Sequence, residues 1–265
     1  MRALVTGGAK RLGREISTYL ASRGYDVAVH YNNSESEALD VTKEINSLGR
    51  ISECLKCDLL IEDEVKELVN RASEAIGGQI TLLVNNASIF EYDSFEDATR
   101  KTWDRHIESN LRAPFVLTQD FAKQSLAPIL DEKNEPISQG LVLNMIDQRV
   151  KKLTPDFASY TIAKMGLWAM TQTAARALAP GIRVNAIGPG PTLIGARQKE
   201  YHFDGQRKNT ILERGANAED ITSAVGYFID AKSVTGQLLC VDGGQHLGWK
   251  TLIFKELSRL QLDFG

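Results

Sequence analysis

Short apolar runs alternate with longer amphipathic segments along most of this chain. Short runs of apolar and β-branched residues predict strands, whereas apolar residues that recur every third or fourth position predict helices. We expect strands at 3–5, 27–29, 51–55, 80–84, 141–143, 183–187 and 238–241. We expect helices at 14–23, 36–48, 62–75, 97–125 and 217–229, and another that carries residue 160 and ends near residue 179.

The order of these elements indicates a fold class. Strands that alternate with helices along a chain pair in parallel, with helices on both faces of the sheet. The predicted strands are continuous apolar runs, which favours burial on both faces. We therefore expect an α/β fold with a doubly wound, parallel, seven-stranded sheet. The polar stretch 131–139 is expected to be a surface loop.

Composition and charge narrow the class of protein. The chain has 265 residues, 43% hydrophobic and 25% charged, which is typical of one globular domain, placed here at 1–248. A net charge of −3 offers no strong field for nucleic acid or an anionic membrane, and no apolar run approaches the ~20 residues that span a bilayer. The three cysteines cannot all pair with one another, and Cys54-Leu-Lys-Cys57 has Cys-x-x-Cys spacing but lacks the second pair that a zinc site needs. The histidines show no metal spacing, so no metal site is predicted, and a cytoplasmic location is expected.

Glycines and polar residues cluster directly after the predicted strands. In an open parallel sheet, ligands bind beyond the carboxyl ends of the strands, where the strand order reverses. Their recurrence at this edge therefore predicts a ligand site. The residues concerned are Gly7, Gly8 and Gly13, Asp58, Asn85 to Ser88, Asp147, and Pro189-Gly190.

The first of these turns, Thr6-Gly-Gly-Ala-Lys-Arg-Leu-Gly13, suits a pyrophosphate. Gly7 and Gly8 allow a tight turn and a close approach of the backbone, and Gly13 allows the next helix to pack on the sheet. The N-terminus of that helix would then direct its amides at the anion. Arg11 stands where dinucleotide-binding turns often have a middle glycine.

Tyr160 and Lys164 lie four residues apart in a segment of helical composition, so they project from one helix face. An ammonium group beside a phenol favours the phenolate. We therefore expect Lys164 to lower the pKa of Tyr160 and to make it a proton donor near neutral pH. The same spacing occurs in ordinary amphipathic helices, so the pair gains its weight from the other motifs.

Taken together, these residues resemble the short-chain dehydrogenase/reductase family over about residues 2–247. The resemblance implies a Rossmann-like fold, a nicotinamide cofactor and a homotetramer. It also implies Tyr160 as proton donor, Lys164 as a ligand of the nicotinamide ribose, and Asn110 as the support of a water relay to Lys164. The motifs that carry it are the glycine turn, Asp58, Asn85-Asn-Ala87, Asn110, Tyr160-x-x-x-Lys164, Pro189-Gly190, Thr235-Gly-Gln and Val241-Asp-Gly-Gly244.

One position departs from the usual family pattern. Most members have a serine thirteen residues before the tyrosine, whereas this chain has Asp147. A carboxylate facing a carbonyl oxygen would repel the developing oxyanion, but it could share a proton with Tyr160 and relay it to a ring nitrogen. The aspartate resembles the pteridine reductase subgroup, in which an aspartate, the tyrosine and the lysine form the catalytic set. Lys10 to Gly13, His30-Tyr31 and Asn85 to Phe90 resemble that subgroup as well.

The subgroup resemblance implies substrate contacts from Arg11, Ser88, Phe90, Asp147 and Tyr160, with Phe90 stacked on a pterin. Phe157 stands where the subgroup has a second tyrosine, which puts part of the hydrogen bonding to substrate in question. Simpler interpretations stay open. Phe90 could be a loop anchor, Arg11 a solvated charge at a helix start, and Asp147 the cap of the next turn.

The end of the second strand predicts the choice of cofactor. NAD enzymes usually place a carboxylate there, but this end reads His30-Tyr-Asn-Asn-Ser34, with no acid before Glu35. Arg11 and Ser34 could instead bind a 2′-phosphate, with Lys10 adding charge. We expect NADP(H), bound by Gly7, Lys10, Arg11, Leu12, Gly13, His30, Tyr31, Asn32, Ser34, Asp58, Leu59, Asn86, Ala87, Ser88, Tyr160, Lys164, Pro189 and Gly190.

These observations predict an NADPH-dependent reductase of a pteridine-like C=N bond. Hydride would go to a ring carbon, and Asp147, Tyr160 and Lys164 would supply or relay the proton. The alternative within enzymes is a 3-oxoacyl or other carbonyl reductase. The alternative of another class is a low-turnover NADP-binding regulator, against which the intact Tyr160, Lys164 and Asn110 count.

Two further segments carry expectations. Residues 192–214 lie where the family has a mobile substrate cover, and their mixed charges favour a surface helix. Residues 249–265 extend past the usual family end, with Ile253, Phe254, Leu257 and Leu260 near one helical face. We expect this extension to pack on the body or on a neighbouring subunit.

Overall fold

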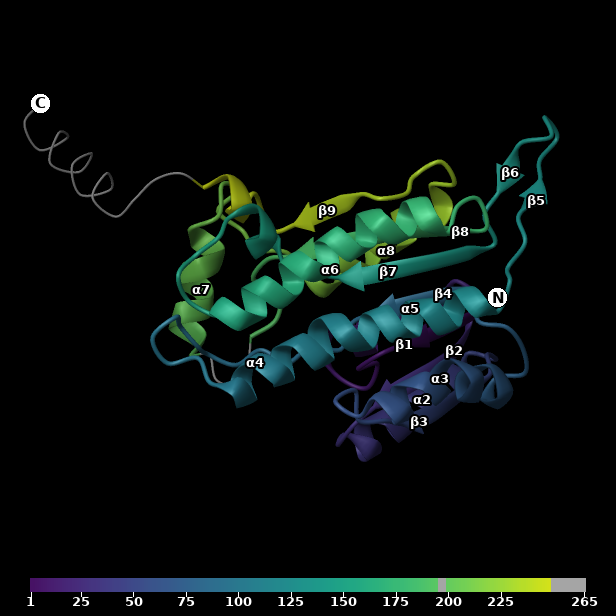
Figure 1. Ribbon diagram of the computed structural model, residues 1–265, viewed down its shortest axis with the longest axis horizontal. Coiled ribbons are helices and arrows are strands. Elements are labelled where there is room, and N and C mark those ends of the chain that lie inside the picture. The colour runs from purple at the N-terminus through teal and green to yellow at the C-terminus, as the bar shows by residue number, and fades with distance from the viewer. Residues whose placement is uncertain (195–198, 249–265) are drawn as a thin grey trace, which may run out of the picture.

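A seven-stranded sheet forms the centre of the protein in this computed structural model, which describes residues 1–194 and 199–248 (Figure 1). Neighbouring strands all pair in parallel, in the order β3-β2-β1-β4-β7-β8-β9. The strands are β1 (Arg2–Val5), β2 (Asp26–Tyr31), β3 (Ser52–Lys56), β4 (Leu82–Asn85), β7 (Gly140–Met145), β8 (Ile182–Pro189) and β9 (Leu238–Val241). The extension 249–265 and its predicted packing lie outside the described residues.

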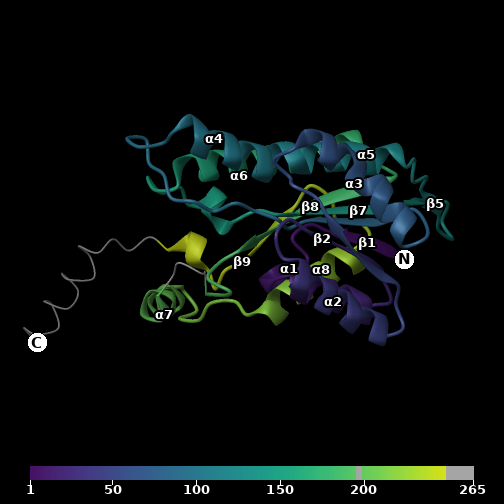
Figure 2. The ribbon, with the colours of Figure 1, turned by 90° about the horizontal axis from the view of Figure 1, so that it is seen from below.

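The helices are α1 (Arg11–Ser22), α2 (Glu35–Ser47), α3 (Glu62–Ala75), α4 (Arg100–Ile107), α5 (Ala113–Lys123), α6 (Ala158–Ala177), α7 (Glu200–Lys208) and α8 (Ala218–Asp230). They cover both faces of the sheet, so the molecule has three layers (Figure 2). Helices α1, α2 and α8 lie on one face, and α3, α5 and α6 on the other. The predicted doubly wound, Rossmann-like fold is confirmed.

Alternate side chains of β1 enter two separate cores, one on each face of the sheet. On β1, Ala3 and Val5 pack with residues of α1 and α8, whereas Leu4 packs with residues of α3 and α5. All three are 0% exposed. Full burial of an aliphatic side chain contributes roughly 1.5–3 kcal/mol. Burial on both faces explains why the strands read as continuous apolar runs.

The predicted helix 97–125 is interrupted in the structure. Helix α4 runs into a π-helical turn, η1 (Glu108–Arg112), and then into α5. Pro114, in the first turn of α5, has no N–H and cannot donate to the carbonyl of Asn110 as a continuous α-helix requires. The wider turn accommodates this loss and places Asn110 inside the fold, at 0% exposure.

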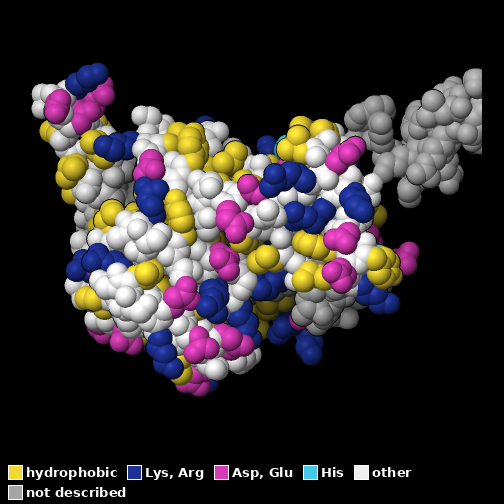
Figure 3. All heavy atoms as spheres, turned by 180° about the vertical axis from the view of Figure 1, so that it is seen from behind, with side chains coloured by type: hydrophobic (Ala, Val, Ile, Leu, Met, Phe, Trp, Pro, Cys, Tyr) yellow, Lys and Arg dark blue, Asp and Glu magenta, His cyan; other side chains and the backbone are white. Residues whose placement is uncertain are grey.

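A short hairpin, β5 (Ile129–Leu130) and β6 (Pro136–Ile137), stands out from the body where a surface loop was expected (Figure 1). Asp131 Oδ1 accepts hydrogen bonds from the N–H groups of Lys133 and Glu135, at 2.8 and 2.9 Å, and closes the turn. Figure 3 shows charged side chains at its tip and a mixture of both signs over the rest of this face. No large field of one sign therefore covers the face in view.

The carboxyl ends of the strands lie at one edge of the sheet, marked in Figure 1 by the arrowheads of β7 and β9. Two 3-10 turns, η2 (Gln148–Lys151) and η3 (Gln245–Leu247), lie at this edge after β7 and β9. Helix α7 falls within 192–214, and none of its side chains is buried, which agrees with the expected surface helix. Within 1–194 and 199–248, no helix is long and apolar enough to cross a membrane.

Candidate active site

Asp147, Tyr160 and Lys164 meet at the carboxyl end of β7. Tyr160 Oη donates a hydrogen bond to Asp147 Oδ2 over 3.0 Å. Lys164 Nζ donates to the carbonyl of Met145 over 2.9 Å and lies 5.7 Å from the centre of the Tyr160 ring. Tyr160 and Lys164 are 5% and 2% exposed. The predicted helix thus brings its two functional side chains to the strand end that carries the aspartate.

The two oxygens of Asp147 have separate partners. Oδ1 accepts from the Arg149 N–H over 2.7 Å and so caps the η2 turn. Oδ2 accepts from Tyr160. Capping and contact with the phenol, which the sequence left as alternatives, are both present. The cap fixes the carboxylate in the orientation that reaches Tyr160.

Burial dominates the protonation of this cluster. It raises the pKa of Tyr160 well above its ordinary value, and the charge of Asp147 raises it further. The lowered pKa that was expected for Tyr160 is not found on balance, and Lys164 Nζ bonds to the Met145 carbonyl rather than to the phenol. Burial also raises the pKa of Asp147 and lowers the pKa of Lys164 to about 8. The cluster keeps a proton on the phenol beside a lysine that is still largely protonated at neutral pH and loses its charge above about pH 8.

Asn110 holds the loop that follows β4. Its Oδ1 accepts from the Ile89 N–H over 2.9 Å, and its Nδ2 donates to the Ile89 carbonyl over 2.8 Å. Both ends of the amide are thus bonded to the residue before Phe90. A water relay from Asn110 to Lys164 stays a prediction.

The glycine turn after β1 is packed so closely that its glycines are required. Gly7 has a φ of +61°, and a methyl group on Gly13 would lie 1.9 Å from the Gly7 carbonyl oxygen. The turn is also bonded to the loop after β4. Thr6 Oγ1 accepts from the N–H groups of Asn86 and Ala87, at 2.9 and 3.0 Å. Asn86 Nδ2 donates back to the Thr6 carbonyl over 2.9 Å.

Arg11 has the backbone conformation of the glycine that it replaces, with a φ of +52°. Its guanidinium donates to the carbonyl of Leu193, in the segment after β8, over 2.8 Å. Lys10 Nζ pairs with Glu37 on α2 at 2.6 Å. The positive charge expected from Lys10 is therefore partly neutralised by Glu37.

His30 has a different role from the one expected. Its ring is buried; Nδ1 accepts from the Gly7 N–H over 2.9 Å, and Nε2 bonds to the Cys57 carbonyl over 3.0 Å. Since Gly7 can only donate, the neutral ring must carry its proton on Nε2. The imidazole therefore has no free nitrogen for a nucleotide, and it acts by holding together the turns after β1 and β3. Burial keeps the ring neutral by lowering its pKa to about 4.

The other expected cofactor residues lie along the same edge. Leu12 stands in the first turn of α1, and Ser34 occupies the N-cap position of α2, close after Tyr31 and Asn32, without a capping hydrogen bond from its side chain. Asp58 follows β3, and its Oδ1 accepts from the Leu60 N–H over 3.0 Å. Leu59 is buried, at 8% exposed. Gly190 packs against the loop after β9, because a methyl group there would lie 2.6 Å from the Cα of Asp242.

The side chains of Phe90 and Phe157 form an aromatic group next to the Tyr160 ring. Phe90 stacks on Phe157 with ring centres 4.3 Å apart, and its edge contact with Tyr160 has a separation of 4.7 Å. Arg149 lies 5.1 Å from the centre of the Phe157 ring. Phe90 is still 51% exposed. Ser88 hydrogen-bonds with Tyr160, which works against the rise in its pKa.

Several residues at this site were not predicted from the sequence. Arg149 lies against Phe157, the position where the subgroup pattern has a tyrosine, and Asp93, His106 and Ser159 form a buried polar cluster beneath Tyr160. Asp93 and His106 are 66 and 53 residues away from Ser159 along the chain, and the cluster follows no motif. Within the described part of the chain, no group of three or more His, Cys, Asp or Glu side chains could hold a metal ion.

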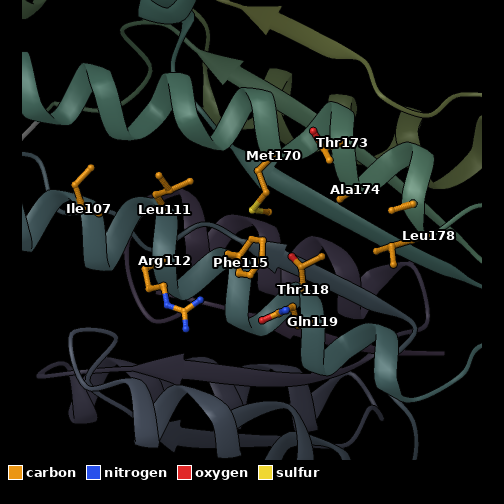
Figure 4. A pocket seen from close by; sticks show the side chains of 11 residues that line it. Ile107, Leu111, Arg112, Phe115, Thr118, Gln119, Met170, Thr173, Ala174 and Leu178 are labelled. Atoms are coloured by element: carbon orange, nitrogen blue, oxygen red, sulfur yellow. The ribbon is translucent and has the colours of Figure 1, made fainter.

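A separate apolar groove of about 630 Å³ runs between α5 and α6 (Figure 4). Leu111 and Phe115 face Met170 and Thr173 across it. Neither Tyr160 nor Asp147 lines the groove, so it is not the site of the proton chemistry.

Comparison with known proteins identifies similar chains. A family model described as enoyl-(acyl carrier protein) reductase matches residues 7–246. The crystal structure of FolM alternative dihydrofolate reductase 1 from Brucella suis in complex with NADP is 44% identical, with a TM-score of 0.87, and the match covers 95% of this chain and 97% of that one. A short-chain dehydrogenase from Burkholderia cenocepacia J2315, also in complex with NADP, is 31% identical, with a TM-score of 0.83 and coverage of 92% and 97%. The 3-oxoacyl-[acyl-carrier-protein] reductase FabG of Staphylococcus epidermidis is 32% identical over 251 residues, which is 92% of this chain and 98% of FabG.

Proposed function

This chain belongs to the short-chain dehydrogenase/reductase family and is an oxidoreductase, and we propose that it uses NADPH to reduce a pteridine-like C=N bond. The observation that carries the proposal is the hydrogen bond between Tyr160 and Asp147. The similarity to a structure described as an alternative dihydrofolate reductase supports it.

The residues of this chain fit a dinucleotide. The backbone at Gly7 and Gly13 is too crowded for side chains, which leaves the first turn of α1 open to a pyrophosphate. Lys10, at the N-cap of α1, makes no side-chain hydrogen bond to the helix end, so the first amides of α1 can bind an anion. Asp58, Leu59, Asn86, Ala87 and Ser88 would contact the adenosine and ribose parts, and Pro189-Gly190 the nicotinamide part. Similar structures contain NADP, which supports this choice of cofactor.

Selectivity for NADPH would come from the absence of a carboxylate at the end of β2. A 2′-phosphate would lie near Asn32 and Ser34, which follow β2, and near Lys10 and Arg11 at the start of α1. Charge-assisted hydrogen bonds from Arg11 would favour a phosphate over a hydroxyl group.

When bound, NADPH supplies the hydride for the reaction. This chain's residues supply the proton: Tyr160 carries it, and Asp147 Oδ2 lies 3.0 Å away to share or replace it. Lys164 supplies a positive charge near Tyr160 and Asp147, because its pKa of about 8 leaves it largely protonated at neutral pH. Protonated Lys164 would also donate to the ribose hydroxyls.

A C=N substrate suits this arrangement better than a ketone does. Reduction of a ring C=N bond places a proton on nitrogen and develops no oxyanion beside Asp147. The burial that raises the pKa of Asp147 favours a carboxyl that can hold a proton for such a transfer. Phe90 offers an exposed ring at the mouth of the site, against which a flat bicyclic substrate could stack.

A carbonyl reductase is the second candidate, and the FabG similarity favours it. The two functions are separated by the loss of NADPH absorbance with purified protein in three parallel assays: with 7,8-dihydrobiopterin, with acetoacetyl-CoA, and with no substrate. Faster oxidation with the dihydropterin supports the proposal. Good turnover of acetoacetyl-CoA with none of the dihydropterin would overturn it. No turnover of either would favour a cofactor-binding regulator.

The groove between α5 and α6 supports assembly with further copies of the chain. Phe115 is 41% exposed at its rim, and the groove is lined mainly by apolar side chains. We propose that this face pairs two subunits of a homotetramer in the cytoplasm. A Phe115→Glu variant should sediment as a smaller species than the wild type, and unchanged sedimentation would contradict the pairing.

A further inference from the structure

A buried polar cluster lies directly beneath the proposed proton donor. It consists of Asp93 in the loop after β4, His106 in α4 and Ser159 in the first turn of α6, none more than 1% exposed. Buried polar groups are costly unless each is paired. The cluster therefore has to be judged by its hydrogen bonds.

Each donor in the cluster meets an acceptor. The Glu91 N–H donates to His106 Nε2 over 3.1 Å, so that nitrogen is an acceptor. A neutral ring then carries its proton on Nδ1, which lies 2.6 Å from Ser159 Oγ and donates to it. The Ser159 hydroxyl in turn donates to Asp93 Oδ2. The hydrogen bonds thus run in one direction, from the Glu91 N–H through His106 and Ser159 to the Asp93 carboxylate. They join three segments of the chain.

Asp93 also holds the start of α6. Its Oδ1 accepts from the Ser159 N–H over 3.1 Å, and its carbonyl accepts from the Phe157 and Ala158 N–H groups, at 2.8 and 3.2 Å. These are the amides that a helix N-terminus leaves without partners of its own. Burial keeps the pKa of His106 below its ordinary value, although the charges of Asp93 and Glu91 oppose this and Arg105 supports it. The ring stays neutral, as the hydrogen-bond direction requires.

The cluster touches both halves of the proposed site. Ser159 immediately precedes Tyr160, and the His106 ring meets the Tyr160 ring edge to face with centres 5.9 Å apart. Glu91 immediately follows Phe90, whose ring lies 4.7 Å from that of Tyr160. A shift of His106 would therefore move the proton donor and the stacking surface relative to each other.

We propose that His106 is a positioning residue, which through Ser159 and Glu91 holds Tyr160 in reach of Asp147 and keeps Phe90 beside it. The part of the inference that concerns Phe90 rests on the proposed function; the part that concerns Tyr160 applies to reduction of either substrate class. A displacement of about 1 Å at a reacting group can cost about 100-fold in rate. The expected signature is a fall in kcat with NADPH binding unchanged.

The test uses His106→Phe, which keeps a ring against Tyr160 but removes both hydrogen bonds. It should lower kcat about 10-fold or more on whichever of 7,8-dihydrobiopterin and acetoacetyl-CoA the wild type reduces. The Kd for NADPH, from fluorescence titration, should change less than about two-fold. In a crystal structure of the variant, the Tyr160 Oη–Asp147 Oδ2 distance should exceed about 3.5 Å, the limit of a hydrogen bond. His106→Asn, which places an amide donor near the position of Nδ1, should restore most of kcat.

A neighbouring hydroxyl provides a matched control. Thr161 is buried on the same turn of α6, and its Oγ1 has no hydrogen-bond partner among the described residues. Ser159→Ala should reproduce the loss of kcat, whereas Thr161→Val should not. If folded His106→Phe keeps the wild-type kcat, or keeps the Tyr160–Asp147 distance at 3.0 Å, His106 is only structural and the inference fails. A wild type that reduces only acetoacetyl-CoA would overturn the pteridine function but leave this test intact.

Discussion

Tyr160 gives its hydrogen bond to Asp147, 3.0 Å away, while Lys164 gives its own to the Met145 carbonyl. The carboxylate therefore pairs with the phenol, which remains protonated beside it because burial and the charge of Asp147 raise the pKa of Tyr160. The proposed function uses this pair to transfer a proton to a basic atom rather than to stabilise an oxyanion. The predictions below test this arrangement and the cofactor side of the crevice.

Replacing Asp147 by serine should change the substrate preference. Asp147→Ser removes the carboxylate that would repel a ketone oxyanion and supplies a hydroxyl donor in its place. The kcat/KM for 7,8-dihydrobiopterin should fall about 100-fold, within the usual contribution of a general acid or base, while that for acetoacetyl-CoA should rise. Asp156→Ser, which removes an exposed carboxylate near the same site, is the control. Equal losses on both substrates would argue against a discriminating role.

Truncation of Phe90 should weaken dihydropterin binding. Aromatic stacking is worth roughly 0.5–1.5 kcal/mol, so Phe90→Ala should raise KM by about 2- to 10-fold with little change in NADPH affinity. Phe95→Ala is a matched control, because Phe95 lies in the same loop and is 85% exposed. A KM that is equal in the two variants would show that Phe90 serves only as an anchor for Phe157.

Glu37→Gln should improve binding of NADPH. Lys10 is paired with Glu37 at 2.6 Å, and its release would leave a full positive charge beside the expected 2′-phosphate. Because both side chains are exposed, the Kd for NADPH should fall by only about two- to five-fold, and the gain should vanish in high salt. Glu44→Gln, which frees Arg14 on the same pair of helices, should leave the Kd unchanged. An unaltered Kd in Glu37→Gln would place Lys10 outside the phosphate site.

Arg11 should show opposite effects on stability and on cofactor binding. Its φ of +52° suits glycine, so Arg11→Gly should be more stable than Arg11→Ala, by about 1 kcal/mol. Both variants lose the guanidinium and should weaken NADPH more than NADH. Chemical denaturation and nucleotide titration of the two variants measure the two effects separately. Equal affinity for NADPH in wild type and variants would leave Arg11 with a conformational role only.

His30 should make stability depend on pH. Its pKa is lowered from 6.5 to about 4 by burial, so between these values the unfolded chain binds the proton and the folded protein does not. Stability from this group is therefore complete above pH 6.5 and is lost as the pH falls towards 4, by roughly 3 kcal/mol in total.

The measurement is urea unfolding at several pH values between 7 and 4. His30→Asn, which does not titrate, should show a flatter profile than the wild type, although it starts from a lower stability. His202→Gln, on the exposed surface of α7, should keep the wild-type slope. A slope unchanged in His30→Asn would mean that other groups cause the acid sensitivity.

The strands of the sheet could be predicted because a strand that is buried on both faces is a continuous apolar run in the sequence. Residues Val27 to Val29 of β2, for example, pack into the cores on both faces of the sheet and are all apolar. The strand can therefore be recognised from its own sequence, without knowledge of the strands that pair with it. The break between α4 and α5 was missed, although Pro114 was its visible cause. The residues on either side of the proline have helical composition, so the sequence predicted one continuous helix despite the lost hydrogen bond. The use of the wider turn becomes clear only from the buried position of Asn110.

The sequence could predict which residues lie at the site, but not the role of each residue there. Tyr160, Lys164 and Asp147 lie together as expected, yet the pKa of Tyr160 moves the opposite way, because burial and a carboxylate outweigh an ammonium that is bonded elsewhere. Whether His30 faces a nucleotide or the interior depends on strand packing, which no local pattern encodes. The cluster of Asp93, His106 and Ser159 joins positions up to 66 residues apart. Contacts of this kind exist only once the chain has folded.

The hydrogen bond from Arg11 to Leu193 has a kinetic consequence. One guanidinium belongs both to the turn where a dinucleotide would bind and to the segment after β8, where the family resemblance predicts the substrate cover. A nucleotide that forms hydrogen bonds with Arg11 would release the segment at Leu193 from the guanidinium. Binding of the nucleotide and binding of the substrate would then be thermodynamically linked, and such linkage is reciprocal. We expect reactants to enter in compulsory order, coenzyme first, and product-inhibition patterns to reveal that sequence of events.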